Sequence, residues 1–385
     1  MKVASYFLDW SEPCLHIGAG SIEKLPSILK SAAVKSVLFV TDEGLTKLNL
    51  TDAPISALKN ENISVTVYDG VLPNPTFKNI EEARELYVKN GCGAIIAFGG
   101  GSPMDCAKVA AARVANPDRT IEEMKGLLKV RKKTPPVFAV PTTAGTGSET
   151  TLAAVVTNVK THEKYAINDP KLRPGYAVLD PLLTVGLPPN ITSTTGMDAL
   201  THAVEAYIGR GNTKKTRQFA EEAVKLIFEN LETAYNDGKN VKARENMLFA
   251  SFCGGAAFTR AYVGYSHAIA HKLGGLYGIP HGLANAVILP YVLDYFGKSA
   301  ETALSRLSDI VGIKGADNSQ KAGAFIEEIR AMNKRMNIPE HISSIKAEDI
   351  PIIAKSALKE ANPLYPVPKI MNRRECEEIV KKIAG

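Results

Sequence analysis

The first half of the chain alternates short apolar runs with segments of helical character, and this alternation limits the possible folds more than any other feature. Four runs rich in valine, isoleucine and phenylalanine are short enough to be buried strands, at residues 36–41, 63–69, 93–101 and 136–143. Candidate helices such as residues 79–90 lie between them. Because parallel strands need crossover connections, this order predicts a parallel, Rossmann-like sheet covered by helices.

The pattern changes after GLPPN at residues 186–190. Before that point, AAVVTN at 153–158 and KYAIND at 164–169 predict an added hairpin, and residues 175–181 predict a last strand. After it, amphipathic helical periodicity dominates, as in residues 213–237 and 322–337. We therefore expect an α/β dinucleotide-binding domain at residues 1–186 and an all-α metal- and substrate-binding domain at 187–385.

Composition narrows the function and the compartment. The 385 residues are 45% hydrophobic and 22% charged, which suits a folded protein of two or three domains. The short basic run at 129–133 has no interleaved aromatics, so no nucleic-acid partner is expected. The chain has no apolar run of about 18 residues, no signal-peptide pattern and five dispersed cysteines. These features predict a cytoplasmic protein that acts on small molecules and does not enter a membrane.

The segment AFGGGSPMDCAK, residues 97–108, follows a predicted buried strand and leads into a helix. Three glycines allow a ligand to approach the backbone closely, and we expect Ser102 to cap the helix with Pro103 at its first position. A helix N-terminus of this kind favours pyrophosphate. The GAGSIEKL segment at Gly18 lacks a third glycine and is interpreted as a turn.

The segment PTTAGTGSETT, residues 141–151, offers several hydroxyls among glycines but no basic residue, which suits hydrogen bonds to a sugar or a nicotinamide amide. Neither glycine-rich loop carries the Gly-Lys-[Ser/Thr] of a P-loop, which disfavours an ATPase. Asp42 closes an earlier strand, where a carboxylate can bind ribose hydroxyls and repel a 2′-phosphate.

Histidines cluster in the second half. The stretch YSHAIAHKLGGLYGIPHG holds His267, His271 and His281, three of the seven in the chain, and Asp198 and His202 are spaced for one helix face. Imidazoles with one carboxylate suit Fe(II) or Zn(II). Spacing alone does not select the ligands. His267 and His271 could chelate from one helix face, whereas the GGLYGIP break could return His281 to the same site.

These motifs in combination resemble the iron-containing, group III alcohol dehydrogenases, which include lactaldehyde reductases, 1,3-propanediol dehydrogenases and butanol dehydrogenases. The resemblance runs along the chain through GGGSPMDCAK, PTTAGTGSE, GMDALTHAVEAY and HAIAHKLGGLYGIPHG. It implies an NAD(H)- and metal-dependent enzyme that interconverts short primary alcohols or diols and aldehydes, with iron as the usual ion and zinc as an alternative. It also implies an active site in the cleft between the two domains, and we expect a homodimer or larger homo-oligomer.

The resemblance also implies roles for individual residues. The metal ligands would be Asp198, His202, His267 and His281, and His271 would be a catalytic non-ligand near the nicotinamide and the substrate. An acidic residue at position 42 is typical of members that prefer NAD. The sequence departs from the family in YVGYSHAIAH, where many members have a smaller or different residue before the first histidine, and we expect Tyr262 and Tyr265 to narrow the substrate pocket. The family's cofactor positions fall on Asp42, Gly99, Gly100, Gly101, Ser102, Asp105, Thr142, Thr143, Thr146 and Lys164.

Other functions share this architecture. Dehydroquinate synthases and glycerol-1-phosphate dehydrogenases act on phosphorylated substrates, which need several cations near the metal, and only Arg260 and Lys272 lie near the histidine cluster in sequence. A glycerol dehydrogenase would not be expected to carry the Asp198 and His202 pair. A non-catalytic assembly protein that binds metal and nucleotide is the alternative outside enzymes.

Overall fold

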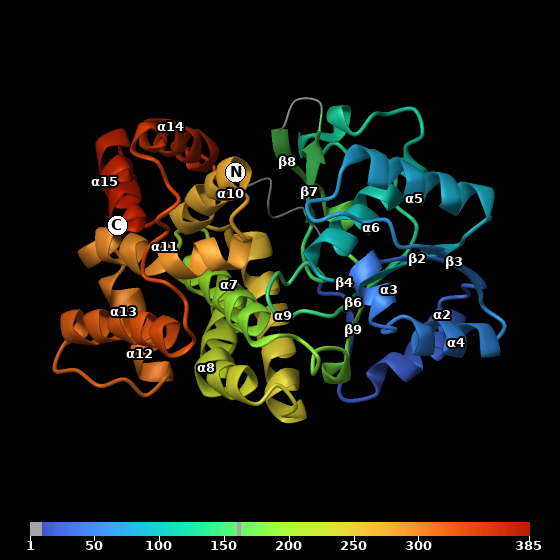
Figure 1. Ribbon diagram of the computed structural model, residues 1–385, viewed down its shortest axis with the longest axis horizontal. Coiled ribbons are helices and arrows are strands. Elements are labelled where there is room, and N and C mark those ends of the chain that lie inside the picture. The colour runs from blue at the N-terminus through green and yellow to red at the C-terminus, as the bar shows by residue number, and fades with distance from the viewer. Residues whose placement is uncertain (1–9, 160–162) are drawn as a thin grey trace. The chain divides into compact units, whose positions relative to one another are not determined.

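The computed structural model describes residues 10–159 and 163–385, which fold into two compact units (Figure 1). One unit, here the sheet unit, comprises residues up to Thr143 together with Gly147–Val185. The other, here the helical unit, comprises Ala144–Thr146 and Gly186–Gly385. No helix in the described residues is long and apolar enough to span a membrane.

The sheet unit is built on six strands that all run parallel. Their order across the sheet is β1 (Cys14–Ile17), β9 (Tyr176–Leu179), β6 (Val137–Pro141), β4 (Ala94–Gly99), β2 (Ser36–Val40) and β3 (Ser64–Tyr68). The parallel sheet and its five predicted strands are thereby confirmed. The edge strand β1 was not predicted, because its sequence CLHI is only partly buried and carries no apolar run.

Helices cover both faces of this sheet. Leu38 and Val40 of β2 pack in one core with α5 (Phe77–Lys89) and α6 (Gly101–Ala115). Val37 and Phe39 point to the opposite core, with α2 (Leu25–Ser31) and α4 (Asp52–Asn60). Alternate residues of one strand are therefore buried on opposite faces, which explains the continuous apolar runs in the sequence.

A second sheet of three strands, ordered β5-β8-β7, belongs to the same unit. The strands β7 (Ala153–Asn158) and β8 (Glu163–Asn168) pair antiparallel, which confirms the predicted hairpin. The strand β5 (Gly126–Leu127) adds to β8. The remaining short elements of the unit are α3 (Glu43–Lys47), η1 (Ser21–Lys24), η2 (Glu122–Met124), η3 (Pro170–Leu172) and η4 (Pro181–Leu183).

The helical unit is built of α-helices and contains no strand in its described residues. The helices are α7 (Pro189–Ile208), α8 (Lys214–Asn236), α9 (Val241–Ala261), α10 (Tyr265–Tyr277), α11 (His281–Phe296), α12 (Glu301–Ile310), α13 (Asn318–Arg335), α14 (Ile350–Ala361) and α15 (Arg373–Ala384), with the short turns η5 (Gly297–Ser299) and η6 (Ala347–Asp349). The parallel sheet followed by helices confirms the predicted fold class.

Helix α7 is the buried centre of the helical unit, and glycines allow its neighbours to approach it. A Cβ added to Gly196 would lie 2.3 Å from the side chain of Leu231 on α8. A Cβ on Gly282, at the start of α11, would lie 2.3 Å from the carbonyl oxygen of Thr194. The start of α11 therefore lies directly against the turn of α7 that precedes Asp198.

Candidate active site

Three helices of the helical unit bring four of the predicted residues together. Asp198 and His202 lie one turn apart on α7, His267 lies in the first turn of α10, and His281 is the first residue of α11. Each offers one ligand atom, and these atoms lie within 4.8 Å of one another. The structure therefore groups Asp198, His202, His267 and His281 at a single point.

The interruption between α10 and α11 explains how His281 joins this group. Helix α10 ends at Tyr277, and Gly278 takes a left-handed conformation with φ of 67°. Pro280 then precedes α11, which begins at His281. A left-handed glycine ends one helix and proline at the next boundary starts another, so the direction of the chain changes within three residues.

The residues of this group fit a divalent metal ion. Nδ1 of His202 and Nε2 of His267 are buried and have no hydrogen-bond partner among the described residues. Burial lowers the pKa of His202 to about 3, against the opposing effect of Asp198, so its imidazole is neutral and carries a free lone pair. Buried polar atoms without partners cost about 1–3 kcal/mol each, and a bound Fe(II) or Zn(II) would satisfy them.

Two further residues, which sequence reasoning missed, hold the ligands. Glu205 Oε2 lies 2.6 Å from Nδ1 of His267, and Asn285 Nδ2 donates to Asp198 Oδ1 at 2.7 Å. Glu205 follows His202 by three residues in the GMDALTHAVEAY motif, and Asn285 follows His281 by four. Those helical spacings from a ligand were the only signal in the sequence.

His271 stands apart from the ligand group. Its Nδ1 lies 2.6 Å from Glu360 Oε1 on α14, and its ring stacks on that of His281 with centroids 5.2 Å apart. Glu360 also accepts hydrogen bonds from Lys272 at 2.5 Å and from the Tyr365 hydroxyl at 2.9 Å. Burial opposes ionisation of Glu360, but its electrostatic interactions and hydrogen bonds with His271 and Lys272 outweigh it and lower its pKa to about 2.

Tyr265 does not have the predicted role. Its ring is completely buried in the helical unit. Its hydroxyl donates to Asn362 Oδ1 at 3.0 Å and accepts from the Met371 amide at 2.9 Å. The expectation that Tyr265 narrows a substrate pocket is wrong, because the side chain braces the segment between α14 and α15 instead.

Several predicted nucleotide-binding residues of the sheet unit lie where the carboxyl ends of its central strands meet. The strands β2, β4 and β6 are parallel neighbours, so Asp42, residues 99–102 and Thr142 all follow carboxyl ends at the same edge. The Thr142 amide donates to the Gly99 carbonyl at 3.1 Å. Gly99 has φ of 147°, and a Cβ there would lie 2.6 Å from Pro103, so glycine is required at this turn.

The start of α6 differs in detail from the prediction. Gly100 is the N-cap residue and Gly101 begins the helix, so Ser102 does not cap it and Pro103 is its third residue. Ser102 Oγ instead accepts a hydrogen bond from the Asn74 amide at 3.2 Å, and Asn74 Oδ1 accepts one from Lys164 at 2.9 Å. Because glycine provides no capping side chain, N–H groups of the first turn remain available to an anion.

Asp105 and Lys108 of α6 hold the loop that follows β6. Asp105 accepts hydrogen bonds from Ser148 Oγ at 3.1 Å and from the Val155 amide at 3.0 Å. Lys108 is completely buried and donates to Ser148 Oγ at 2.8 Å and to Thr151 Oγ1 at 2.7 Å. Sequence reasoning missed Lys108. Thr143 lies close to Gly100 in the sheet unit, whereas Thr146 groups with the helical unit.

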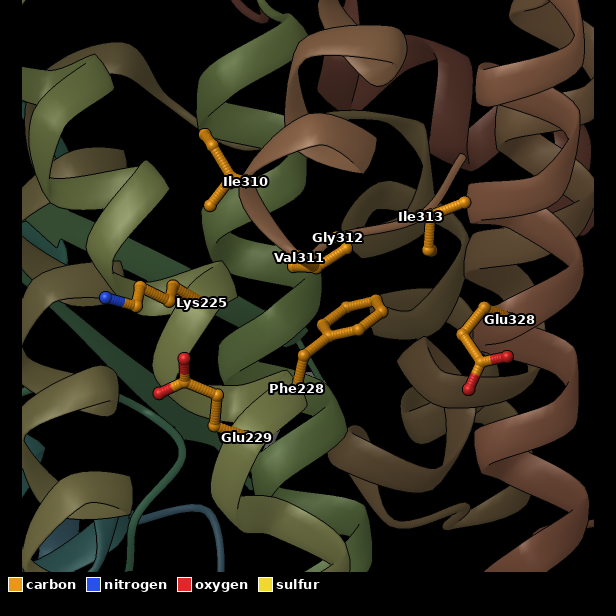
Figure 2. Close-up of a pocket in the computed structure, with 8 residues that line it drawn as sticks. All are labelled: Lys225, Phe228, Glu229, Ile310, Val311, Gly312, Ile313 and Glu328. Atoms are coloured by element: carbon orange, nitrogen blue, oxygen red, sulfur yellow. The ribbon is translucent and has the colours of Figure 1, made fainter. Parts of the chain in front are cut away.

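A separate cavity of about 490 Å³ lies in the helical unit, between α8 and the connection from α12 to α13 (Figure 2). Phe228 forms part of its wall, and Lys225 and Glu328 line it. None of the predicted site residues lines this cavity. The histidine group is therefore not part of this cavity.

Comparisons with known proteins match the first and second halves of the chain to two family profiles. A family profile described as iron-containing alcohol dehydrogenase matches residues 13–181, and one described as Fe-containing alcohol dehydrogenase family, C-terminal, matches residues 192–384. The 1,3-propanediol dehydrogenase of Citrobacter freundii is 38% identical over 95% of each chain. The NAD-dependent methanol dehydrogenase of Bacillus methanolicus is 33% identical over 96% of this chain and 97% of its own. A crystal structure of 1,3-propanediol oxidoreductase has a TM-score of 0.94 at 36% identity and covers 98% of this chain and 100% of its own.

Proposed function

Because the chain belongs to the iron-containing alcohol dehydrogenase family, we propose that it interconverts small primary alcohols or diols and aldehydes with NAD(H) at a metal held by Asp198, His202, His267 and His281. The observation that carries the metal site is the set of four ligand atoms within 4.8 Å. Membership confirms the predicted family and the predicted oxidoreductase class, with a nicotinamide cofactor and a metal.

When bound, the metal supplies a Lewis acid for the alcohol or aldehyde oxygen, and the nicotinamide accepts or supplies the hydride. The protein's contribution begins with the ligand group. Asp198 is fixed by the Asn285 amide, and Glu205 accepts a hydrogen bond from Nδ1–H of His267. Burial keeps His202 neutral. These contacts orient the donor atoms before any metal arrives.

We propose that His271 moves the proton. Its Nδ1 is engaged by Glu360, which leaves Nε2 as the atom that accepts a proton in alcohol oxidation and returns it in aldehyde reduction. The side chain is 35% exposed, so the proton can pass on to solvent. The ionised Glu360 stabilises the imidazolium that forms in this step.

We propose that the sheet unit binds the dinucleotide and corresponds to the predicted domain at residues 1–186, with residues 187–385 as the metal- and substrate-binding domain. The uncapped first turn of α6 would hold the pyrophosphate through Gly99, Gly100, Gly101 and Ser102. The carboxylate of Asp42 would bind ribose hydroxyls and disfavour the 2′-phosphate of NADP. The other cofactor positions that we propose are Asp105, Thr142, Thr143, Thr146 and Lys164.

We propose that the enzyme is a cytoplasmic homodimer or larger homo-oligomer. All five cysteines are free thiols, and four of them are buried, which suits a reducing compartment. Light scattering coupled to size-exclusion chromatography measures the oligomeric state, and a monomer would contradict this part of the proposal.

The proposed reaction is tested with C2 to C6 alcohols, diols and aldehydes, using anaerobically purified protein of known metal content. Consumption or formation of NADH is followed at saturating cofactor. We expect turnover of short primary alcohols or diols, dependence on Fe(II), and preference for NAD(H) over NADP(H). Turnover only of a phosphorylated substrate would support the rival glycerol-1-phosphate dehydrogenase, and metal binding without any turnover would support a binding protein.

A further inference from the structure

Glu205 is a buried carboxylate that does not belong to the group of four candidate metal ligands. It lies on α7, one turn after His202, and only 3% of the residue is exposed. Its Oε2 accepts the Gly264 amide at 2.7 Å and lies 2.6 Å from Nδ1 of His267. Its Oε1 accepts the Ser266 amide at 2.8 Å. One side chain on α7 therefore engages three successive points at the start of α10.

The backbone at this junction is unusual. Tyr262, the residue that follows α9, has φ of 66° and ψ of 176°, a conformation that non-glycine residues rarely adopt. Gly264 precedes α10 and provides no capping side chain. A Cβ at Gly264 would lie 2.7 Å from Oε1 of Glu205, so the contact requires glycine there. Glu205 thus acts as the cap of α10 from another helix, and its negative charge suits a helix N-terminus.

The same carboxylate determines which nitrogen of His267 carries the proton. A carboxylate only accepts hydrogen bonds, so a bond of 2.6 Å to Nδ1 places the imidazole proton on Nδ1. Nε2 then carries the lone pair. That atom is buried, has no hydrogen-bond partner among the described residues, and lies 3.9 Å from Asp198 Oδ1.

We propose that Glu205 is a positioning residue for the metal centre, which anchors the start of α10 and holds His267 as the tautomer whose Nε2 faces Asp198. This inference rests on the proposed metal site. It assigns a role to a residue that touches neither the metal nor the substrate, and it links the strained turn at Tyr262 to the geometry of the ligands.

The test is Glu205→Gln, which preserves shape and removes one acceptor. If the NH2 group of the glutamine takes the place of Oε1, it faces the Ser266 N–H. If it replaces Oε2, it faces the Gly264 N–H and donates to Nδ1 of His267, which moves the imidazole proton to Nε2. Either orientation sets an NH2 group against a backbone N–H at the start of α10, and the second also reverses the tautomer of His267. Loss of a carboxylate that orients a ligating histidine typically weakens metal binding by about 10- to 100-fold.

Metal affinity is measured on metal-free protein with Zn²⁺ in competition with a chromophoric chelator, and ligand geometry is measured from the visible absorption of Co²⁺. The matched control is Glu221→Gln, since Glu221 also accepts a hydrogen bond, from the Tyr207 hydroxyl at 2.9 Å, at a site away from the ligands. We expect weaker Zn²⁺ binding and an altered Co²⁺ spectrum for Glu205→Gln, partial recovery for Glu205→Asp, and wild-type behaviour for the control.

A second variant covers the case in which Glu205→Gln does not fold. Gly264→Ala keeps the carboxylate but forces a Cβ against it, and we expect the same weakening of Zn²⁺ binding. Folded variants at both positions with wild-type affinity and spectrum would overturn the inference. Failure of the wild-type protein to bind Zn²⁺ or Co²⁺ would instead overturn the proposed metal site.

Discussion

Glu360 Oε1 lies 2.6 Å from Nδ1 of His271, the same distance that separates Glu205 Oε2 from Nδ1 of His267. Both histidines lie on α10, one helical turn apart, and each is paired with a carboxylate from a different helix. Only His267 has its other nitrogen in the four-residue ligand group. The two pairs thus have the same local chemistry and different proposed tasks, namely metal binding and proton transfer.

Replacement of His271 tests this separation. We expect His271→Ala to retain its metal and to lose turnover by about 10²-fold or more, because proton transfer by a positioned side chain contributes about 10²–10⁴-fold. Metal content by elemental analysis and kcat for alcohol oxidation are the two measurements. Glu360→Gln should lower kcat by a smaller factor at unchanged metal content. A His271→Ala protein without metal would show that His271 is a ligand.

Removal of a ligand should empty the site. We expect His267→Ala and His281→Ala each to lose most of the metal, since each supplies one of the four donor atoms. Activity should fall by about 10³-fold or more, as for removal of an electrostatic stabiliser of the transition state. His341→Ala is the control, because His341 lies on the surface and contacts the Lys382 carbonyl. Full metal occupancy in either ligand variant would contradict the assignment.

Asp42 should control the choice of nucleotide. Its Oδ1 caps α3 by accepting the Leu45 amide at 3.1 Å, and its negative charge lies at the carboxyl end of β2. We expect Asp42→Gly to raise kcat/KM for NADP by about 10-fold or more relative to NAD, because like-charge repulsion is removed. Asp118→Gly, at an exposed position of the same unit, is the control. An unchanged ratio of the two values would exclude this role.

Glu149 should make stability depend on pH. It is 1% exposed, its Oε1 has no hydrogen-bond partner among the described residues, and burial raises its pKa to about 7 even though Lys108 opposes the rise. The raised value means that the folded form holds the proton more tightly than the unfolded form. Its contribution to stability is therefore complete below about pH 4.5 and is lost as the pH rises to about 7.

Glu149→Gln removes that dependence. At pH 4.5 we expect the variant and the wild type to have nearly the same melting temperature. At pH 8 we expect the free energy of unfolding of the variant to exceed that of the wild type by at most about 3 kcal/mol. Calorimetry of the metal-free proteins at both pH values measures the difference. Glu85→Gln, an exposed substitution in the same unit, should show no such pH dependence. A variant that is less stable than the wild type at pH 8 would contradict the prediction.

The elements that local pattern predicts well are those with strong periodicity. The five apolar runs became parallel strands and the 153–169 segment became a hairpin, because burial on both faces or on one face leaves a local signature. The edge strand β1 left no such signature, since its side chains are only partly buried. At the start of α6 the capping prediction was wrong by two residues, because Ser102 bonds to Asn74, a partner distant in sequence.

Sequence by itself determined the order of strands and helices, the glycine-rich turn, the family, and the set of candidate ligands. Helical spacing alone made His267 and His271 equally good partners for a metal. The family resemblance implied a different role for each, and only the tertiary structure shows their different contacts, since Glu360 lies 89 positions from His271 and Glu205 lies 62 from His267. Periodicity reports which face of an element is buried. Which nitrogen meets which carboxylate depends on the packing of α7, α10, α11 and α14, and no local pattern encodes that packing.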